Sequence, residues 1–128
     1  MLQRDLIMRV IQLFFEALAR FLRNKEGKSP DILRRELDDL YKSFLKHPRG
    51  HFNDMSVEDI LKSFIEEERI AKGEIVAELI FQDALVENAD RQLLVKALAL
   101  FKQVDLMSET FSFDRQRKMM EIESLIKA

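Results

Sequence analysis

The stretch LIMRVIQLFFEALARFL, residues 6–22, decides the fold because its polar residues follow a single helical stripe. Asp5, Arg9, Gln12, Glu16 and Arg20 are separated by four, three, four and four residues, which places them on one helix face. The apolar remainder covers roughly 240° of the circumference, whereas the outer helix of a bundle needs little more than about 100°. The stretch therefore predicts a helix over about residues 2–24 with more apolar surface than one neighbour covers.

Three explanations for this excess apolar surface are open. The helix is central and packs against several neighbours within its own chain, which is the favoured explanation. Alternatively, one flank of the helix closes a symmetric dimer, or the helix lies in a membrane interface. The residues expected on the dimer flank are Phe14, Phe15, Leu18 and Leu22.

The same stretch argues against a signal peptide or a membrane span. Its longest unbroken apolar runs are three residues, whereas a signal peptide needs roughly 7 to 15. A spanning helix would place Arg9, Glu16 and Arg20 in hydrocarbon, at roughly 2.5 to 3.5 kcal/mol for each central Arg. We expect neither.

The rest of the chain also has helical periodicity, and no segment alternates with period two. Gly73 is ambiguous, because it either separates two helices or lies within one. Helix starts are expected at Ser29 with Pro30, at Ser56, near Asp90 and near Ser112, and stops at Pro48 with Gly50 and near Asn88. The prediction is an all-α single domain, residues 1–128, of five or six antiparallel helices. They form a compact bundle or a tetratricopeptide-like array, which the step from Ala97 to Phe101 suggests.

The composition excludes several kinds of site. The 128 residues are 47% hydrophobic and 34% charged, which is typical of a globular domain. There is no cysteine, so disulfides, thiolate metal sites and cysteine nucleophiles are excluded, and a cytoplasmic location is favoured. The net charge of −2 gives no basic stripe of the kind that nucleic acid requires.

Two clusters could carry chemistry, but both have simpler explanations. His47, His51 and Asp54 form a conceivable metal set, yet Pro48 and Gly50 prevent the helix that would align the histidines, so a surface turn is expected. The acidic stretch is expected to be a solvated helix face; it consists of Glu66, Glu67, Glu68, Glu74 and Glu78. No glycine-rich phosphate loop or nucleophile elbow occurs.

The segment TFSFDRQRK, residues 110–118, is the most distinctive stretch near the carboxyl end. Thr110 or Ser112 is expected to cap the last helix, while Phe111 and Phe113 are expected to clamp the entry turn onto the core. A weaker alternative is a small anion-binding patch. Its candidate residues are Arg115, Arg117 and Lys118, together with Arg49 in the earlier Pro-Arg-Gly turn.

Two stretches resemble a family of small, uncharacterised bacterial helical proteins. RDLIMRVI at residues 4–11 is similar to their start, an acidic residue and a hydrophobe followed by Ile-Met-Arg, and TFSFDRQRK is similar to their final helix. Leu6 departs from the pattern, which has an aromatic residue there. The two motifs cover about a fifth of the chain. The resemblance implies a bacterial, largely helical protein, tetratricopeptide-like in its helix pairing, and it carries no catalytic residues.

Taken together, these features predict a non-enzymatic interaction or structural module without a cofactor or metal. Its partner is expected to be another protein or a second copy of the chain, bound through the first helix. The alternative is a carrier for a small or lipid-like molecule held among the Phe and Met side chains between helices. An enzyme ranks third, and a pocket uniting a histidine with Glu74 or Glu78 would favour it.

Overall fold

The computed structural model describes residues 2–128, with side chains from residue 4 onward, and every element within this range is helical. The elements are α1 (Leu2–Arg23), α2 (Pro30–Leu45), α3 (Val57–Lys62), the short 3₁₀ helix η1 (Glu66–Glu68), α4 (Arg69–Val86), α5 (Arg91–Met107) and α6 (Phe113–Lys127). The predicted all-α fold of five or six helices is confirmed, with six α-helices in this range. None of these helices is long and apolar enough to cross a membrane.

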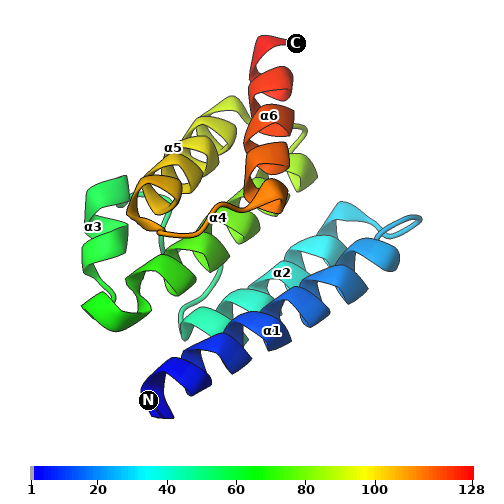
Figure 1. The fold of residues 1–128 in the computed structure, drawn as a ribbon. Helices are drawn as coiled ribbons and strands as arrows, with labels where there is room; N and C mark the ends of the chain where they lie inside the picture. Colours follow the sequence, from blue (N-terminus) through cyan, green and yellow to red (C-terminus); the bar gives the residue numbers. More distant parts are fainter. Residues whose placement is uncertain (1) are drawn as a thin grey trace.

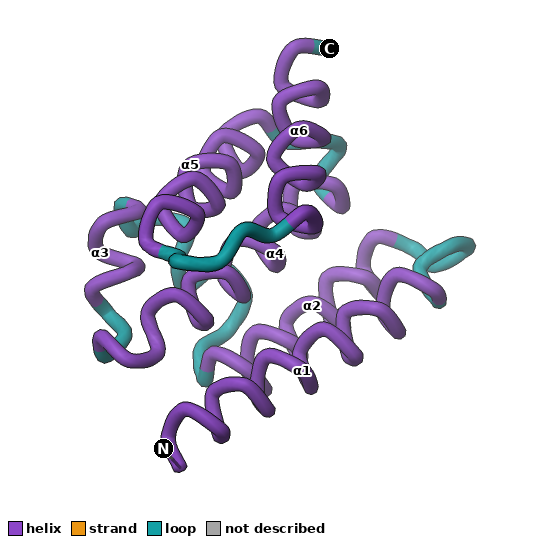
Figure 2. The backbone as a smooth tube through the Cα atoms, in the orientation of Figure 1, coloured by secondary structure: helices purple, strands orange, loops and turns teal. Residues whose placement is uncertain are grey.

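Helix α4 lies at the centre of the molecule (Figure 1). The antiparallel pair α1 and α2 packs on one side of it, and α3, α5 and α6 lie on the other. Most loops between the helices are short, but a longer one, residues 46–56, joins α2 to α3 (Figure 2). The fold is thus a central helix between two helical layers.

The central position of α4 follows from its sequence. Every residue from Ile75 to Ala84 is buried, and most of them are apolar, as expected of a helix that is buried on all sides. The expectation that the first helix is central is therefore wrong. Helix α1 buries only one face, because α2 and α4 are its main neighbours. The large apolar side chains of α1 that stay exposed are Leu6, Met8, Leu13 and Leu22.

Four predicted helix starts are confirmed by capping hydrogen bonds. The side chains of Ser29, Ser56, Asp90 and Ser112 each accept a hydrogen bond from the backbone N–H three residues on, at 3.0–3.3 Å. Each such cap contributes about 1 kcal/mol to helix stability. The caps therefore set where α2, α3, α5 and α6 begin.

Gly73 does not break a helix but lies inside α4, at the closest approach of two neighbours. A Cβ placed there would lie 2.7 Å from Cδ2 of Leu61 in α3 and 3.0 Å from Cγ2 of Val104 in α5. Side chains of α3 and α5 pack directly against the backbone of α4 here, so any larger residue would have to displace Leu61 and Val104. This close contact offsets the roughly 1 kcal/mol that glycine costs in a helix interior.

The entry to α6 differs from the expected clamp. Ser112 caps the helix as predicted, but Phe111 and Phe113 point away from the core and are exposed. Their rings contact each other edge to face, with centroids 4.8 Å apart. The clamp prediction is wrong because Arg115, rather than either phenylalanine, is the residue of this segment that packs inward.

We expect Gly73→Val to lower the free energy of unfolding by at least about 2 kcal/mol, because Leu61 and Val104 cannot both move away. Urea denaturation followed by circular dichroism measures this change. The matched control is Ala71→Val, two residues earlier on a half-buried part of α4, which should cost only roughly 0.5 kcal/mol of helix propensity. Equal losses in the two variants would contradict the close contact at Gly73.

Candidate functional site

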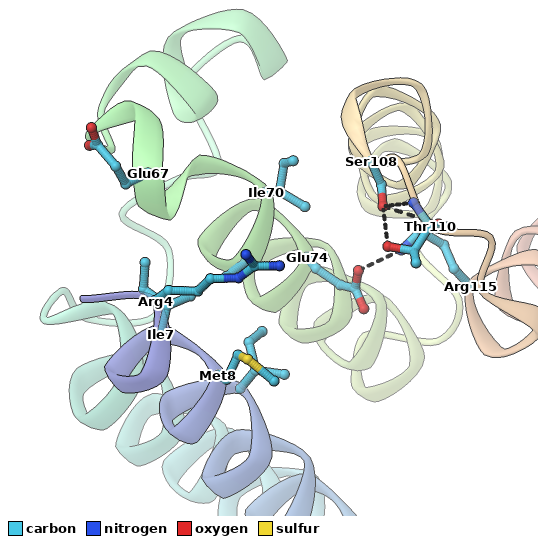
Figure 3. A pocket seen from close by; sticks show the side chains of 11 residues that line it. Arg4, Ile7, Met8, Glu67, Ile70, Glu74, Ser108, Thr110 and Arg115 are labelled. Carbon is cyan, nitrogen blue, oxygen red and sulfur yellow. Dashed lines mark hydrogen bonds and ion pairs between the residues drawn. The ribbon is translucent and has the colours of Figure 1, made fainter. Parts of the chain in front are cut away.

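A groove with a volume of about 670 Å³ lies between α1, the start of α4 and the connection from α5 to α6 (Figure 3). We call it the α1–α4 groove. The residues that line it are Arg4, Ile7, Met8, Ile11, Glu67, Ile70, Ala71, Glu74, Ser108, Thr110 and Arg115. The sequence alone did not identify this groove, because its walls come from α1, the start of α4 and the start of α6, which are far apart in the chain.

The apolar walls of the groove come from two helices. Helix α1 contributes Ile7, Met8 and Ile11, which belong to the part of its wide apolar surface that α2 and α4 leave uncovered. The first turns of α4 contribute Ile70 and Ala71. Part of the excess apolar surface predicted for the first helix thus forms one wall of the α1–α4 groove.

The floor of the groove holds a buried ion-pair cluster around Arg115, whose side chain is 5% exposed. Its Nη1 donates to Oε1 of Glu74 at 2.8 Å, its Nε donates to Oδ1 of Asp105 at 2.9 Å, and its Nη2 donates to the carbonyl oxygen of Thr110 at 3.1 Å. This cluster ties α6 to α4, α5 and the loop between α5 and α6. Each of the three guanidinium nitrogens donates to an acceptor of the chain itself, so Arg115 is committed to holding the fold together.

A second pair, Lys118 with Glu78, lies one turn further along α6 and α4. The Lys118 ammonium pairs with Glu78 and with Oδ2 of Asp114 at 3.1 Å. The same ammonium lies 5.3 Å from the ring centroid of Phe15 in α1, a distance at which a cation is attracted to an aromatic face. Lys118 therefore joins three helices.

The carboxyl group of Glu78 is almost fully buried, with a side chain that is 1% exposed. Its Oε2 pairs with Lys118, whereas its Oε1 has no hydrogen-bond partner. Burial raises the pKa of Glu78 from 4.5 to about 7, and Lys118 offsets this effect only in part.

Arg49 is also committed to internal partners. Its Nε pairs with the buried Asp83, and its Nη2 pairs with Glu87 at 2.7 Å. The Tyr41 hydroxyl donates to Oδ2 of Asp83 at 2.6 Å, and Arg34 donates two hydrogen bonds to Glu87. The Pro-Arg-Gly turn is thereby fixed onto α4.

The predicted anion-binding patch is therefore wrong for three of its four residues. Arg49, Arg115 and Lys118 each bind carboxylates of their own chain, because α4 carries those carboxylates into the interior. Arg117 alone is well exposed, and it pairs with Asp114 on the same helix. These basic residues hold the fold together.

The predicted dimer flank of the first helix needs a similar correction. Phe14 and Leu18 are buried in the core, and Phe15 is half-buried under Lys118. Of the four residues, only Leu22 is an exposed apolar side chain. The buried side chains of this flank pack into the core beside α2 and α4, so the flank is largely covered by the chain itself.

The two histidines lie in the turn that follows α2, as predicted. Their rings stack in parallel with centroids 3.8 Å apart, and both pack edge-on against Phe52. Neither lines the α1–α4 groove. Across residues 2–128 no group of three or more His, Asp and Glu side chains is placed to hold a metal ion.

The acidic stretch divides into two parts. Glu66, Glu67 and Glu68 form η1 and are exposed or half-buried, as expected of a solvated face. Glu74 and Glu78 instead point inward to Arg115 and Lys118. The sequence did contain a signal for this pairing. Glu74 and Glu78 are four residues apart, and Arg115 and Lys118, about 40 positions later, are three residues apart. Each pair therefore lies on one face of its helix, so the acids can face the bases.

Comparison of the chain with protein-family models, with curated proteins and with solved structures gives no match.

We expect Glu78→Gln to change how stability depends on pH. Since Glu78 binds its proton more tightly in the folded state than at its ordinary pKa of 4.5, the native protein should lose stability as pH rises from 4.5 to 7. Relative to the variant, the loss between pH 5 and pH 8 should be about 2 kcal/mol. Urea denaturation at both pH values measures it.

The control for this measurement is Glu58→Gln, which removes an exposed carboxyl whose pKa is lowered by Lys62. That variant should keep the pH dependence of the native protein between pH 5 and pH 8. Identical pH dependence in Glu78→Gln and the native protein would show that Glu78 is not held in the interior.

We expect Arg49→Met to cost about 3 kcal/mol of unfolding free energy, because it leaves the buried Asp83 carboxylate without its cation. The matched variant Lys62→Met removes an exposed pair with Glu58 and should cost less than about 1 kcal/mol. Urea midpoints at constant slope give both values. A loss at Arg49 no larger than that at Lys62 would contradict the structural role of Arg49.

Proposed function

We propose that this chain is a non-enzymatic interaction module that binds an apolar helical segment of another protein in the α1–α4 groove. The observation that carries the proposal is the combination of apolar walls, formed by Ile7, Met8, Ile11 and Ile70, with a floor whose buried charges are already paired. Such a groove favours the binding of apolar side chains over the binding of a charged ligand.

An amphipathic helix suits this shape because its apolar residues recur every three to four positions on one face. The groove runs between α1 and α4, so a third helix would extend the packing of these two. In Figure 3 the Arg4 side chain extends from α1 across the groove toward α4, whereas Glu67 points away from the centre of the groove, and the two offer charges of opposite sign. These two residues would favour one direction of the bound helix over the other.

The groove holds few of the groups that usually perform catalysis, because besides Glu74, which Arg115 occupies, its lining offers only the carboxyl of Glu67. Its lining includes two carboxylates, of which Glu74 is paired with Arg115, and no histidine, lysine or tyrosine. A general base needs a free titratable group near its substrate. Because the chain has no cysteine, we place the module in the cytoplasm.

The second candidate function is a carrier for a small apolar molecule with an acidic end. The observation that favours it is the groove volume of about 670 Å³, which lies within the usual range for small-ligand sites of about 300–1,000 Å³. In this case Arg4 would hold the acidic group, and Ile7, Ile11 and Ile70 would contact the apolar part.

The decisive experiment places a photoreactive amino acid at Met8 in the groove and, as the control, at Val95, an exposed apolar position on α5. After irradiation in the host cell, we expect discrete polypeptide adducts from position 8 but not from position 95. Adding Ile70→Asp should remove those adducts, because a charge in the apolar wall is costly to desolvate.

Native mass spectrometry of protein purified from the same cells distinguishes the second candidate. A retained molecule of a few hundred daltons that Ile70→Asp releases, without polypeptide adducts at position 8, would support the carrier and reject the interaction module. Equal adducts at positions 8 and 95, with no bound molecule, would contradict both functions.

A further inference from the structure

Glu78 carries the one buried side-chain atom that lacks a hydrogen-bond partner in the part of the chain whose side chains the structure describes. Its side chain is 1% exposed, and the atom without a partner is Oε1. Buried polar atoms are almost always hydrogen-bonded, because water is not available to replace a missing partner. A role in stabilising the fold does not explain an oxygen in this state.

Glu78 lies where three helices meet. Helix α6 packs along α5 and reaches α4 through two ion pairs, of which one joins Lys118 to Glu78. Lys118 also reaches α1, because its ammonium lies 5.3 Å from the ring centroid of Phe15. The contact between α6 and α1 at this point thus depends on where Glu78 holds Lys118.

The charged groups around Glu78 oppose one another. Lys118 and Asp114 face it from α6, and Glu74 faces it from the preceding turn of α4. From α1 the facing group is the uncharged ring of Phe15. Lys118 favours the ionised carboxylate, whereas burial and the two acidic groups disfavour it, and the pKa of Glu78 is raised to about 7. Both protonation states are therefore populated near neutral pH.

Lys118 has a second partner nearer to the surface. Asp114 lies one turn earlier on α6, its side chain is 46% exposed, and its Oδ2 lies 3.1 Å from the Lys118 ammonium. The long lysine side chain can turn toward this carboxylate without unfolding α6. The ion pair of Arg115 with Glu74 keeps α6 on α4 in either state.

We propose that Glu78 is a proton switch for the contact between α6 and α1. When Glu78 is ionised, it holds Lys118 against Phe15 and so links the two helices. When Glu78 takes up a proton, Lys118 turns toward Asp114 and solvent, and Phe15 is released. The switch does not rest on the proposed binding partner, because both of its states belong to the free protein.

The switch acts at one end of the α1–α4 groove. Phe15 lies one helical turn after Ile11, which lines the groove. Release of Phe15 loosens this end of the α1 wall, and a preformed wall binds a partner more tightly than a loose one. The groove is thus best formed when Glu78 is ionised.

The switch and the stability of the whole chain respond to pH in opposite directions. The protonated carboxyl group avoids the cost of burying a charge, so the free energy of unfolding is higher below about pH 7. The contact of Lys118 with Phe15 is instead stronger above that pH. A measurement at these two side chains therefore separates the switch from a general loss of structure.

Nuclear magnetic resonance of the full chain tests the switch directly. The carboxyl carbon of Glu78, the Cε of Lys118 and the ring protons of Phe15 should titrate together, with one midpoint at about pH 7. One pH unit on either side of the midpoint should change the ratio of the two states roughly tenfold. The proposal is overturned if the Phe15 ring does not follow the Glu78 carboxyl carbon, or if Glu78 titrates at its ordinary value of 4.5.

Variants locate the switch. Glu78→Gln has the shape of the protonated carboxyl group, so Lys118 and Phe15 should keep their low-pH resonances between about pH 5 and pH 8. Lys118→Met removes the ammonium, so the Phe15 ring should no longer follow Glu78. The matched control combines His47→Gln with His51→Gln, which replaces two exposed titratable groups and should leave the Phe15 titration unchanged. A Phe15 titration that persists in Glu78→Gln, or that disappears in the control, would overturn the proposal.

Discussion

The constraint on which the structure depends is that its central helix carries carboxylates into the interior. Glu74, Glu78 and Asp83 lie on α4 among apolar residues that are fully buried. A buried carboxylate without a partner costs several kcal/mol, so each needs a cation or donor from another element. Arg115 and Lys118 come from α6 and Arg49 from the turn after α2. The positions of α6 and of this turn follow from that requirement.

The same constraint explains why three basic residues that the sequence suggested as anion-binding candidates are instead paired within the protein. Arg49, Arg115 and Lys118 have the surroundings of surface residues, although their partners lie 34 to 41 residues away. The matched spacing of two acids and two bases is a sign of the pairing for Arg115 and Lys118, but periodicity gives none for Arg49. The helices themselves were predictable, because caps at Ser29, Ser56, Asp90 and Ser112 and the polar stripe of α1 are local signals. The pairing between distant segments was not predicted.

Burial was the least predictable property of the candidate sites. The sequence showed that the first helix has too much apolar surface, but not which flank its own chain covers, and Phe14 and Leu18 proved to be interior. The opposite error occurred at Phe111 and Phe113, whose aromatic character suggested a core position although both are exposed. In each case burial depends on how α6 and α1 approach α4. Ion pairs between distant segments fix α6, whereas α1 is held by the packing of buried side chains such as Phe14 and Leu18.

The short connections between helices also have a consequence for how the chain folds. Helix α4 packs against α5, and α5 packs against α6, so these three consecutive helices bring together residues that are close in the sequence. Closing short loops costs little entropy, and proteins dominated by local helical contacts fold in microseconds to milliseconds. We therefore expect α4, α5 and α6 to assemble first, with α1 and α2 adding to a preformed surface. The groove along α1 would then be the last part of the molecule to take shape.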